Sequence, residues 1–254
     1  MTPRAALVAR LRAAGCVFAE EEALLLEAAT GPEPLEAMVS RRTAGEPLEY
    51  ILGWVEFCGR RLTVRPGVFV PRRRTEFLVS HAIALTLPGD VVLDLCCGCG
   101  AIGVAIGHAV DAVELHAADL GPAAVQCARD NTAVLDAHVY QGDLFDPLPS
   151  SLRGRVNILA ANVPYVPTDA IAEMPPEARD HEPHVTLDGG ADGLDVVRRV
   201  ARHASEWLAA AGHVLIETSE RQAPIAAAIY ADAGLSPLIA HSDDLSATIV
   251  IGAA

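Results

Sequence analysis

Residues 91–100 are VVLDLCCGCG, and this stretch decides the fold class. Its first half, VVLDL, is the short apolar run that is typical of a buried strand. The small residues of CCGCG predict a tight turn, and AIGVAIGHAV at 101–110 predicts the helix that follows. We therefore expect a strand, a turn and a helix, which together form the repeating unit of an α/β sheet.

The same alternation continues toward the C-terminus. Further strands are expected in VELHAADL, AHVYQGDL, VNILAANVPY and HVLIETS, and helices in PAAVQCARDNTA, GLDVVRRVARHASEWLAA and APIAAAIYADAG. Alternating strands and helices predict a parallel sheet that is covered on both faces. The last two strands, near 237–241 and 246–251, have no helix between them, so we expect an antiparallel hairpin at one edge.

The residues before this pattern have a different character. In 2–45, leucine and alanine recur at helical spacing, and Gly31-Pro32 separates two of the predicted helices. The segments YILGWVEF and RRLTV are short and β-rich, with Cys58-Gly59 between them, which predicts a hairpin. We expect three parts, which are a helical domain at 1–48, a β-hairpin linker at 49–75 and an α/β domain at 76–254.

The composition excludes several classes of protein. All 19 cationic residues are arginine, whereas Walker-type phosphate loops and pyridoxal-phosphate enzymes both need a lysine. No apolar run reaches the roughly 18 residues that cross a bilayer. Arg10 and Arg12 interrupt the first apolar segment, which therefore predicts an amphipathic helix and not a signal peptide. We expect a cytoplasmic protein without membrane contact.

The charge is unevenly distributed along the chain. Residues 1–80 contain 11 Arg and 10 acidic residues, whereas residues 81–254 contain 8 Arg and 23 acidic residues, a balance of −15. Proteins that bind nucleic acid need a basic face, so this acidity argues against direct nucleic-acid binding over the whole surface. The arginines of the first part are either solvated surface or a place for an acidic or ribonucleoprotein partner.

Two groups of residues could suggest a metal site. Cys96 and Cys99 have the C-x2-C spacing of zinc ligands, but the chain offers no matching second pair. Together with Cys97 they are better explained as small residues of a loop. His181 and His184 lie in an acidic loop that contains proline, where an ordinary surface role is the simpler explanation. We expect no metal.

Small and polar residues follow four predicted strands at their carboxyl ends, where the ligands of open α/β sheets bind. DLCCGCG follows the first strand, and a generic strand-to-helix turn explains it equally well when it is taken alone. Asp119 ends the second strand, where its carboxylate could accept hydrogen bonds from both hydroxyls of a ribose or could cap a helix. Gly142-Asp143 ends the third strand, where the carboxylate could reach an adenine amino group or simply form a turn.

The fourth strand ends in Asn162-Val163-Pro164-Tyr165. The nitrogen of an amide or aromatic amine is a poor nucleophile because its lone pair is delocalised. The side-chain oxygen of Asn162 and the carbonyl of Val163 could accept both of its N–H bonds and aim the lone pair at a methyl sulfonium. Pro164 would stiffen the turn, and Tyr165 would pack flat on the planar group. Taken alone, the motif could also be a strand exit that contains proline.

The order of these motifs resembles that of the HemK/PrmC family of glutamine N5-methyltransferases. The family's Asn-Pro-Pro-Tyr and Asp-Leu-Gly-Thr-Gly-Ser-Gly motifs correspond to NVPY and DLCCGCG in this chain. The other matching segments are GEPLEYILG at 45–53, VPRRRTE at 70–76, GDLF at 142–145 and EPHVTLDGGADGLDVVRR at 182–199. The last of these is the most specific, because no simple rule for helices, strands or turns would produce it.

The resemblance implies a fold, a cofactor, a reaction and a set of residues. The fold would be the seven-stranded, Rossmann-like sheet of class I methyltransferases, with a small helical N-terminal domain for a protein substrate. The cofactor would be S-adenosyl-L-methionine, and the reaction N5-methylation of a glutamine, such as that in the Gly-Gly-Gln loop of a peptide chain release factor. The expected catalytic residues are Asn162, Val163, Pro164 and Tyr165, and the expected cofactor-binding residues are Asp94, Cys96, Cys97, Gly98, Cys99, Gly100, Asp119, Leu120, Gly142, Asp143, Leu144 and Asn162.

The chain also departs from the family pattern. Val163 replaces a proline whose carbonyl the family uses, and Cys96 replaces the first glycine of the loop. Arg73 and Arg74 replace a proline and a glutamate, and Leu144 stands where some relatives carry an aromatic residue. These departures indicate a divergent branch.

Three alternative functions remain open. They are an adenine-N6 amino-methyltransferase on nucleic acid, a non-catalytic S-adenosylmethionine-binding protein, and a nicotinamide oxidoreductase. The first shares a similar strand-four motif, and the altered DLCCGCG loop keeps the second open. The missing G-x-G-x-x-G spacing weakens the third.

Overall fold

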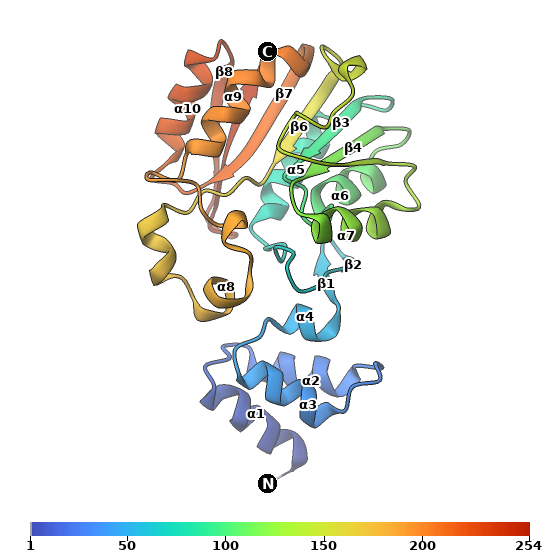
Figure 1. The fold of residues 1–254 in the computed structure, drawn as a ribbon, viewed down its shortest axis with the longest axis vertical. Coiled ribbons are helices and arrows are strands. Elements are labelled where there is room, and N and C mark those ends of the chain that lie inside the picture. Colours follow the sequence, from blue (N-terminus) through green and yellow to red (C-terminus); the bar gives the residue numbers. More distant parts are fainter. Residues whose placement is uncertain (1) are drawn as a thin grey trace.

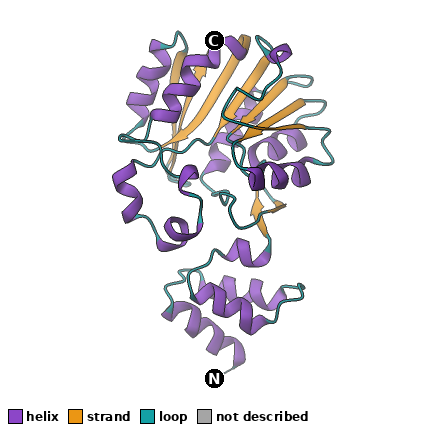
Figure 2. Cartoon of the chain, viewed as in Figure 1, coloured by secondary structure: helices purple, strands orange, loops and turns teal. Residues whose placement is uncertain are grey.

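A computed structural model of the chain describes residues 2–254. A helical part at the N-terminus and a large sheet lie at opposite ends of the molecule, with a small hairpin between them (Figure 1). Helices and strands alternate along most of the larger part, which ends in two strands with no helix between them (Figure 2). None of the helices described in this range combines the length and apolar character that crossing a bilayer requires.

The N-terminal helices have a hydrophobic core of their own. They are α1 (Pro3–Ala13), α2 (Ala19–Ala28), α3 (Leu35–Thr43) and α4 (Leu48–Leu52). The buried cluster that they share is separate from the clusters on the large sheet, and it includes Leu7, Leu11, Ala23, Leu26, Met38, Val39, Leu48 and Ile51. Thr2 caps α1 by accepting a hydrogen bond from the amide of Ala5, and Pro3 occupies the first helical position, where its missing N–H has no cost.

The hairpin pairs β1 (Trp54–Phe57) with β2 (Arg60–Thr63) in antiparallel register. The predicted hairpin is therefore confirmed, but its expected start at residue 50 is wrong because the YIL sequence is helical. The helix α4 starts after Pro47 and ends at Gly53, whose φ of 78° closes the helix before the strand begins.

The large sheet has seven strands in the order β5-β4-β3-β6-β7-β9-β8. Its strands are β3 (Val91–Leu95), β4 (Glu114–Asp119), β5 (His138–Gln141), β6 (Val156–Ala161), β7 (Leu208–Thr218), β8 (Ser236–Ser242) and β9 (Ala247–Ala253). All neighbouring pairs from β5 to β7 are parallel, whereas β9 is antiparallel to both β7 and β8. The predicted fold class and the antiparallel hairpin at the edge are confirmed.

Helices cover both faces of this sheet (Figure 1). On one face lie α5 (Thr75–Leu85), α6 (Ala101–Ala109) and α7 (Pro122–Thr132), and on the other lie α9 (Asp195–Trp207) and α10 (Ala223–Asp232). Successive side chains of β3 enter different cores, since Val91, Leu93 and Leu95 pack in one cluster and Val92 packs in the other. The end predicted for α9 was wrong, because Leu208 already belongs to β7.

A long segment between β6 and α9 connects the two ends of the molecule. It contains α8 (Pro176–His181) and two short 3₁₀ turns, Thr168–Glu173 and His184–Thr186. Glu177 in α8 lies 3.0 Å from the guanidinium of Arg42 in the N-terminal helices. The carboxylate of Glu182 accepts hydrogen bonds from the Val70 amide at 3.0 Å and from Arg72 at 2.7 Å. The segment therefore joins the N-terminal helices, the linker and the sheet.

Candidate cofactor and active site

A cavity of about 190 Å³ lies at the carboxyl ends of β3, β4, β5 and β6, and we call it the strand-end cavity. The predicted residues that line it are Cys96, Cys97, Gly98, Cys99, Asp119, Leu120, Gly142, Asp143, Leu144, Asn162 and Pro164. Four other predicted residues, which are Asp94, Gly100, Val163 and Tyr165, do not line it. Residues that the sequence did not indicate complete its wall, among them Phe57, Phe69, Thr75, Val185, Val196 and Arg199.

The turn after β3 uses left-handed backbone at three positions. The φ angles are 56° at Cys96, 55° at Gly98 and 79° at Gly100. A Cβ at Gly100 would lie 3.3 Å from Ala128, so this glycine lets α6 approach α7, which explains why it is needed although it does not line the cavity. Cys96 adopts the backbone conformation that favours glycine while carrying a side chain.

The cysteines of this turn form part of the wall and do not act as nucleophiles. Burial raises the pKa of the Cys96, Cys97 and Cys99 thiols, and the nearby Asp94 and Asp119 carboxylates raise it further for Cys96 and Cys97. The thiolate is the reactive form of cysteine, so these groups stay protonated and inert. All six cysteines are free thiols.

Asp94 lies beneath the turn and is fully buried. One of its oxygens accepts a hydrogen bond from the Gly103 amide at 2.8 Å, and the other has no hydrogen-bond partner. Burial raises the pKa of Asp94 to about 8, and the charge of Asp119 adds to this rise. Asp94 was expected to contact the cofactor, but it is placed to hold the first turn of α6 under the loop.

Asp119 reaches into the cavity from the end of β4. Its two oxygens accept hydrogen bonds from the backbone amides of Gly98 and Gly121, each at 2.8 Å. Burial raises the pKa of Asp119, and these hydrogen bonds oppose the rise. Each carboxylate oxygen has a second acceptor site, so the group can hold the loop and still accept hydroxyl donors from a ligand.

Asp143 and Arg199 form an ion pair at the far wall of the cavity. The guanidinium of Arg199 on α9 donates to the Asp143 carboxylate at 2.7 Å. Because the pair neutralises the only arginine in the cavity wall, Asp119 leaves the wall with a negative balance. Such a wall favours a cationic ligand.

Asn162 follows β6 and lines the same cavity. Its side-chain Nδ2 donates to the hydroxyl of Thr75 at 3.3 Å. Among residues 2–254, no donor is hydrogen-bonded to Asn162 Oδ1 or to the carbonyl of Val163. The side chain of Val163 is buried in the core. The turn thus has two oxygens without an internal donor on successive residues, of which Asn162 lines the cavity and Val163 does not.

Tyr165 lies elsewhere than expected. Its hydroxyl donates to Glu217 at 2.7 Å, and its ring lies 5.9 Å from the guanidinium of Arg74. The ring contributes to a second cavity beside Thr218 and His241, and not to the strand-end cavity. In this arrangement the tyrosine anchors the turn, and it is not placed to pack on a planar group held by Asn162.

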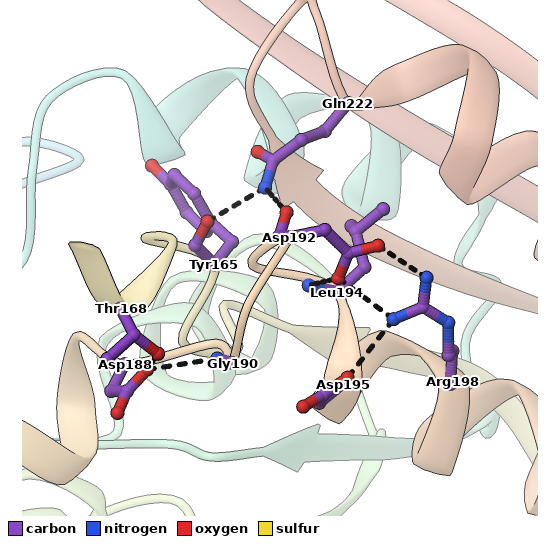
Figure 3. A network of polar contacts seen from close by, with 9 residues as sticks. All are labelled: Tyr165, Thr168, Asp188, Gly190, Asp192, Leu194, Asp195, Arg198 and Gln222. Atoms are coloured by element: carbon purple, nitrogen blue, oxygen red, sulfur yellow. Dashed lines mark hydrogen bonds and ion pairs between the residues drawn. The ribbon is translucent and has the colours of Figure 1, made fainter. Parts of the chain in front are cut away.

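A glycine-rich loop supports the same turn from the side of α9 (Figure 3). The buried amide of Gln222 donates to the carbonyls of both Tyr165 and Asp192, each at 2.9 Å. A Cβ at Gly193 would lie 2.3 Å from the Tyr165 carbonyl oxygen and 2.4 Å from the Gln222 nitrogen. This close approach gives a physical reason for the LDGGADG sequence, which sequence rules left unexplained.

The residues that sequence reasoning missed are Thr75, Arg199, Glu217 and Gln222. Each comes from a helix or strand far along the chain from the residue that it contacts, so spacing alone could not pair them. One indication was available, since the acidic Glu217 directly follows the apolar run VLI of a predicted strand. A buried acid in such a strand needs partners.

Within residues 2–254, no group of three or more His, Cys, Asp or Glu side chains is arranged to hold a metal ion. His184 lies 3.7 Å from Asp188 in an exposed pair. The chemistry of the strand-end cavity fits S-adenosylmethionine instead. It offers a carboxylate for ribose hydroxyls at Asp119, apolar side chains at Leu120 and Leu144 for a flat base, and a negative balance for a sulfonium.

Comparisons with known proteins agree with this chemistry. Residues 60–174 match the model of the family described as methyltransferase small domain. A release factor glutamine methyltransferase from Geobacter sulfurreducens is 34% identical over 226 residues, which cover 87% of this chain and 78% of the relative. A 4-amino-L-phenylalanine/4-methylamino-L-phenylalanine methyltransferase from Streptomyces pristinaespiralis is 35% identical, covering 77% of this chain and 69% of the relative.

A solved methyltransferase structure from Pyrococcus furiosus shares the fold, with a TM-score of 0.59 and 13% identity over 77% of this chain and 89% of that one. At this identity the likeness concerns the fold alone. The identity and coverage of the Geobacter relative go further. The chain belongs to the family of release factor glutamine methyltransferases.

Proposed function

We propose that this methyltransferase transfers a methyl group from S-adenosylmethionine to the side-chain nitrogen of a glutamine in a peptide chain release factor. The family and its cofactor are shown by the relatives of this chain. The name of the Geobacter relative supports the release factor as substrate. Since release factors act in translation, we place the reaction in the cytoplasm.

The proposed cofactor site uses the residues at three strand ends. S-adenosylmethionine supplies a methyl group on a positively charged sulfur that is an excellent leaving group. Asp119 would accept the ribose hydroxyls, Leu120 and Leu144 would flank the adenine, and Asp143 would lie near its amino group. Gly98 and its cysteine neighbours would leave the backbone close to the methionine end.

The proposed substrate site is the turn after β6. Asn162 Oδ1 and the Val163 carbonyl would accept the two N–H bonds of the substrate amide, so that its lone pair points toward the methyl group. These acceptors would favour the developing tetrahedral nitrogen more than the planar ground state. Pro164 would restrict the turn, and Tyr165 would hold it to Glu217. The observation that carries the proposal is that Asn162, whose Oδ1 has no hydrogen-bond donor in the described residues, lines the cavity.

A second candidate is methylation of an aromatic amine. The Streptomyces pristinaespiralis relative is named for an amino-phenylalanine substrate, and the same two acceptors would fit its NH₂ group. The cavity wall also holds apolar residues, including Phe57, Phe69 and Val185, which would suit an aromatic ring. The substrate must therefore be decided by direct comparison.

The test is incubation of the wild-type enzyme with labelled S-adenosylmethionine and, separately, a release factor, 4-amino-phenylalanine, DNA and RNA. We expect label in the release factor alone, and peptide mass spectrometry should place one extra methyl on one glutamine. A release factor with that glutamine changed to asparagine is the matched control and should stay unlabelled. Labelling of the free amino acid or of nucleic acid, with none in the release factor, would overturn the proposal.

A further inference from the structure

We infer that Glu217, acting through the hydroxyl of Thr75, is a positioning group that determines which end of the Asn162 amide faces the substrate. This inference rests on the proposed function for the role of Asn162. It concerns three groups from separate elements, since Glu217 lies on β7, Thr75 begins α5 and Asn162 follows β6. None of them is close to another along the chain.

Glu217 gathers three donors in a buried place. Its side chain is 1% exposed. One oxygen accepts a hydrogen bond from the Thr75 hydroxyl at 2.6 Å. The other accepts hydrogen bonds from the Tyr165 hydroxyl at 2.7 Å and from the Arg74 guanidinium at 2.9 Å. All three donors, one of which is the arginine, point at the carboxylate oxygens, so Glu217 is the acceptor in each of these contacts.

The direction of hydrogen bonding follows from this carboxylate. A threonine hydroxyl has one proton, and the Thr75 proton goes to Glu217. Toward Asn162, Thr75 can then only accept, so it selects the amide nitrogen, which lies 3.3 Å away. Rotation of the Asn162 amide by half a turn would place two acceptors, Oδ1 and the Thr75 oxygen, against each other. The relay therefore keeps Oδ1 directed away from Thr75.

The chemical consequence concerns the substrate nitrogen. The NH₂ group of the substrate amide donates hydrogen bonds, so it needs acceptors. A rotated Asn162 would face it with a second NH₂ group, which is also a donor. An asparagine that is free to rotate would lose its preference for the productive orientation. Glu217 thus acts on the reaction through Thr75 and Asn162, since it is not among the residues that line the cavity.

The central test compares Thr75→Val, Thr75→Ser and Thr86→Val. Valine keeps the shape of threonine and removes the hydroxyl, whereas serine keeps the hydroxyl. Thr86 ends the same helix, is also buried, and bonds only the Ala82 carbonyl, so Thr86→Val is the matched control. We expect kcat on the release factor to fall about ten-fold in Thr75→Val, the effect of losing roughly one hydrogen bond. Thr75→Ser and Thr86→Val should stay close to wild type, and all three should bind S-adenosylmethionine normally.

Glu217→Gln is a second variant that does not depend on how well Thr75→Val folds. The side-chain oxygen of the glutamine can still accept hydrogen bonds from Arg74 and Tyr165, and the NH₂ group of the glutamine then faces Thr75. Thr75 would accept from that group and donate to Asn162, so the direction of the relay would be reversed. We expect kcat to fall further than in Thr75→Val, with cofactor affinity retained.

A spectroscopic measurement separates this inference from the proposed function. The side-chain NH₂ resonance of Asn162 can be assigned in ¹H–¹⁵N spectra by its loss in Asn162→Asp. We expect it to keep its position in Thr75→Ser and to move in Thr75→Val. If the wild-type enzyme methylates no release factor but the resonance behaves in this way, the relay stands and the proposed function fails. If the enzyme is active and Thr75→Val changes neither kcat nor the resonance, or if Thr75→Ser loses as much as Thr75→Val, the relay is wrong.

Discussion

Asp94 and Asp119 lie at the ends of neighbouring strands, but their carboxyl groups have different surroundings. Asp119 faces the strand-end cavity and holds two backbone amides, whereas Asp94 lies beneath the loop with one oxygen unpaired. The sequence placed both at strand ends, but it could not separate the one that lines the cavity from the one that supports it. That difference depends on which face of β3 and β4 is covered by α6, and this is a property of the packed structure.

Asp119→Ala should weaken cofactor binding. The change removes a carboxylate from the cavity and leaves the Gly98 amide without its acceptor. We expect the dissociation constant of S-adenosylmethionine to rise roughly 10- to 100-fold, which corresponds to losing hydrogen bonds to a charged group. Calorimetry measures this dissociation constant. The control is Asp111→Ala, which makes the same change in charge at an exposed loop position. Unchanged affinity in Asp119→Ala would remove Asp119 from the cofactor site.

Asp94→Asn should change the pH dependence of stability. The pKa of Asp94 is about 8 in the folded protein and about 3.9 in an unfolded chain. Between these values the folded state holds a proton that the unfolded state releases, so this group lowers the free energy of unfolding as pH rises. The slope is at most about 1.4 kcal/mol per pH unit. Asparagine does not titrate, so the stability of the variant relative to wild type should increase from about pH 4 to pH 8.

Urea unfolding at several pH values measures this difference directly. The comparison isolates Asp94, because all other titrating groups are shared by the two proteins. A constant difference between the two proteins across the range would show that Asp94 is ionised at neutral pH in the folded state.

The turn after β6 owes its shape to neighbouring elements as much as to its own residues. Gln222 at the start of α10 and the loop before α9 hold the backbone of Tyr165, while Glu217 on β7 holds its hydroxyl. The turn and its supports come from β6, β7, α5 and α10, so the acceptors of Asn162 and Val163 are set on rigid parts of the fold.

Gly193→Ala should distort this turn. Gly193 has a φ of 76°, and an added Cβ would meet the Tyr165 carbonyl and the Gln222 nitrogen far inside contact distance. We expect a loss of stability of roughly 3 kcal/mol or more, from a clash added to backbone strain, together with reduced kcat. Gly154→Ala separates the two effects, because its φ is 70° but no atom lies within 4 Å of the added Cβ. Gly154→Ala should cost only about 1 kcal/mol. Equal losses in the two variants would mean that the contact with the turn is unimportant.

Elements with strong periodicity were predictable from sequence, and those fixed by distant contacts were not. The run VVLDL and the helix after it follow from apolar spacing alone. The YIL sequence at 50–52 has strand-forming residues but lies between Pro47 and Gly53, which favour a single helical turn. Helix α5 begins after Arg74 without a side-chain cap, so it has no clear start in the sequence, which did not indicate it. The 166–194 segment has no periodic pattern because its structure depends on what it contacts.

On the scale of the whole molecule, a buried ion-pair group holds the N-terminal helices to the rest. Arg42 on α3 bonds Glu22 on α2 at 2.6 Å, and it also pairs with Glu177 on α8 at 3.0 Å. Helix α8 belongs to the segment that lines the strand-end cavity. The contacts of Arg42 therefore connect the N-terminal helices to a part of the cavity wall.

Arg42→Ala should destabilise the protein far more than the loss of a surface pair. Glu22 would be left buried without its cation, which costs about 3–5 kcal/mol for buried pairs. Arg12→Ala breaks the exposed pair with Glu20 and should have little effect on the melting temperature. Thermal unfolding compares the two variants, and similar melting temperatures would show that the Arg42 contacts do not hold the N-terminal helices.

The central claim is that the Asn162 side-chain oxygen receives the substrate nitrogen beside a cofactor held by other residues. The decisive measurement is turnover of a release factor together with S-adenosylmethionine affinity in Asn162→Ala. The control is Asn157→Ala on β6, since Asn157 accepts a hydrogen bond from the Val91 amide and does not line the cavity. We expect Asn162→Ala to lose turnover by at least about a hundred-fold while its cofactor affinity stays within a few-fold of wild type, and Asn157→Ala to keep both. Wild-type turnover in Asn162→Ala would contradict the central claim.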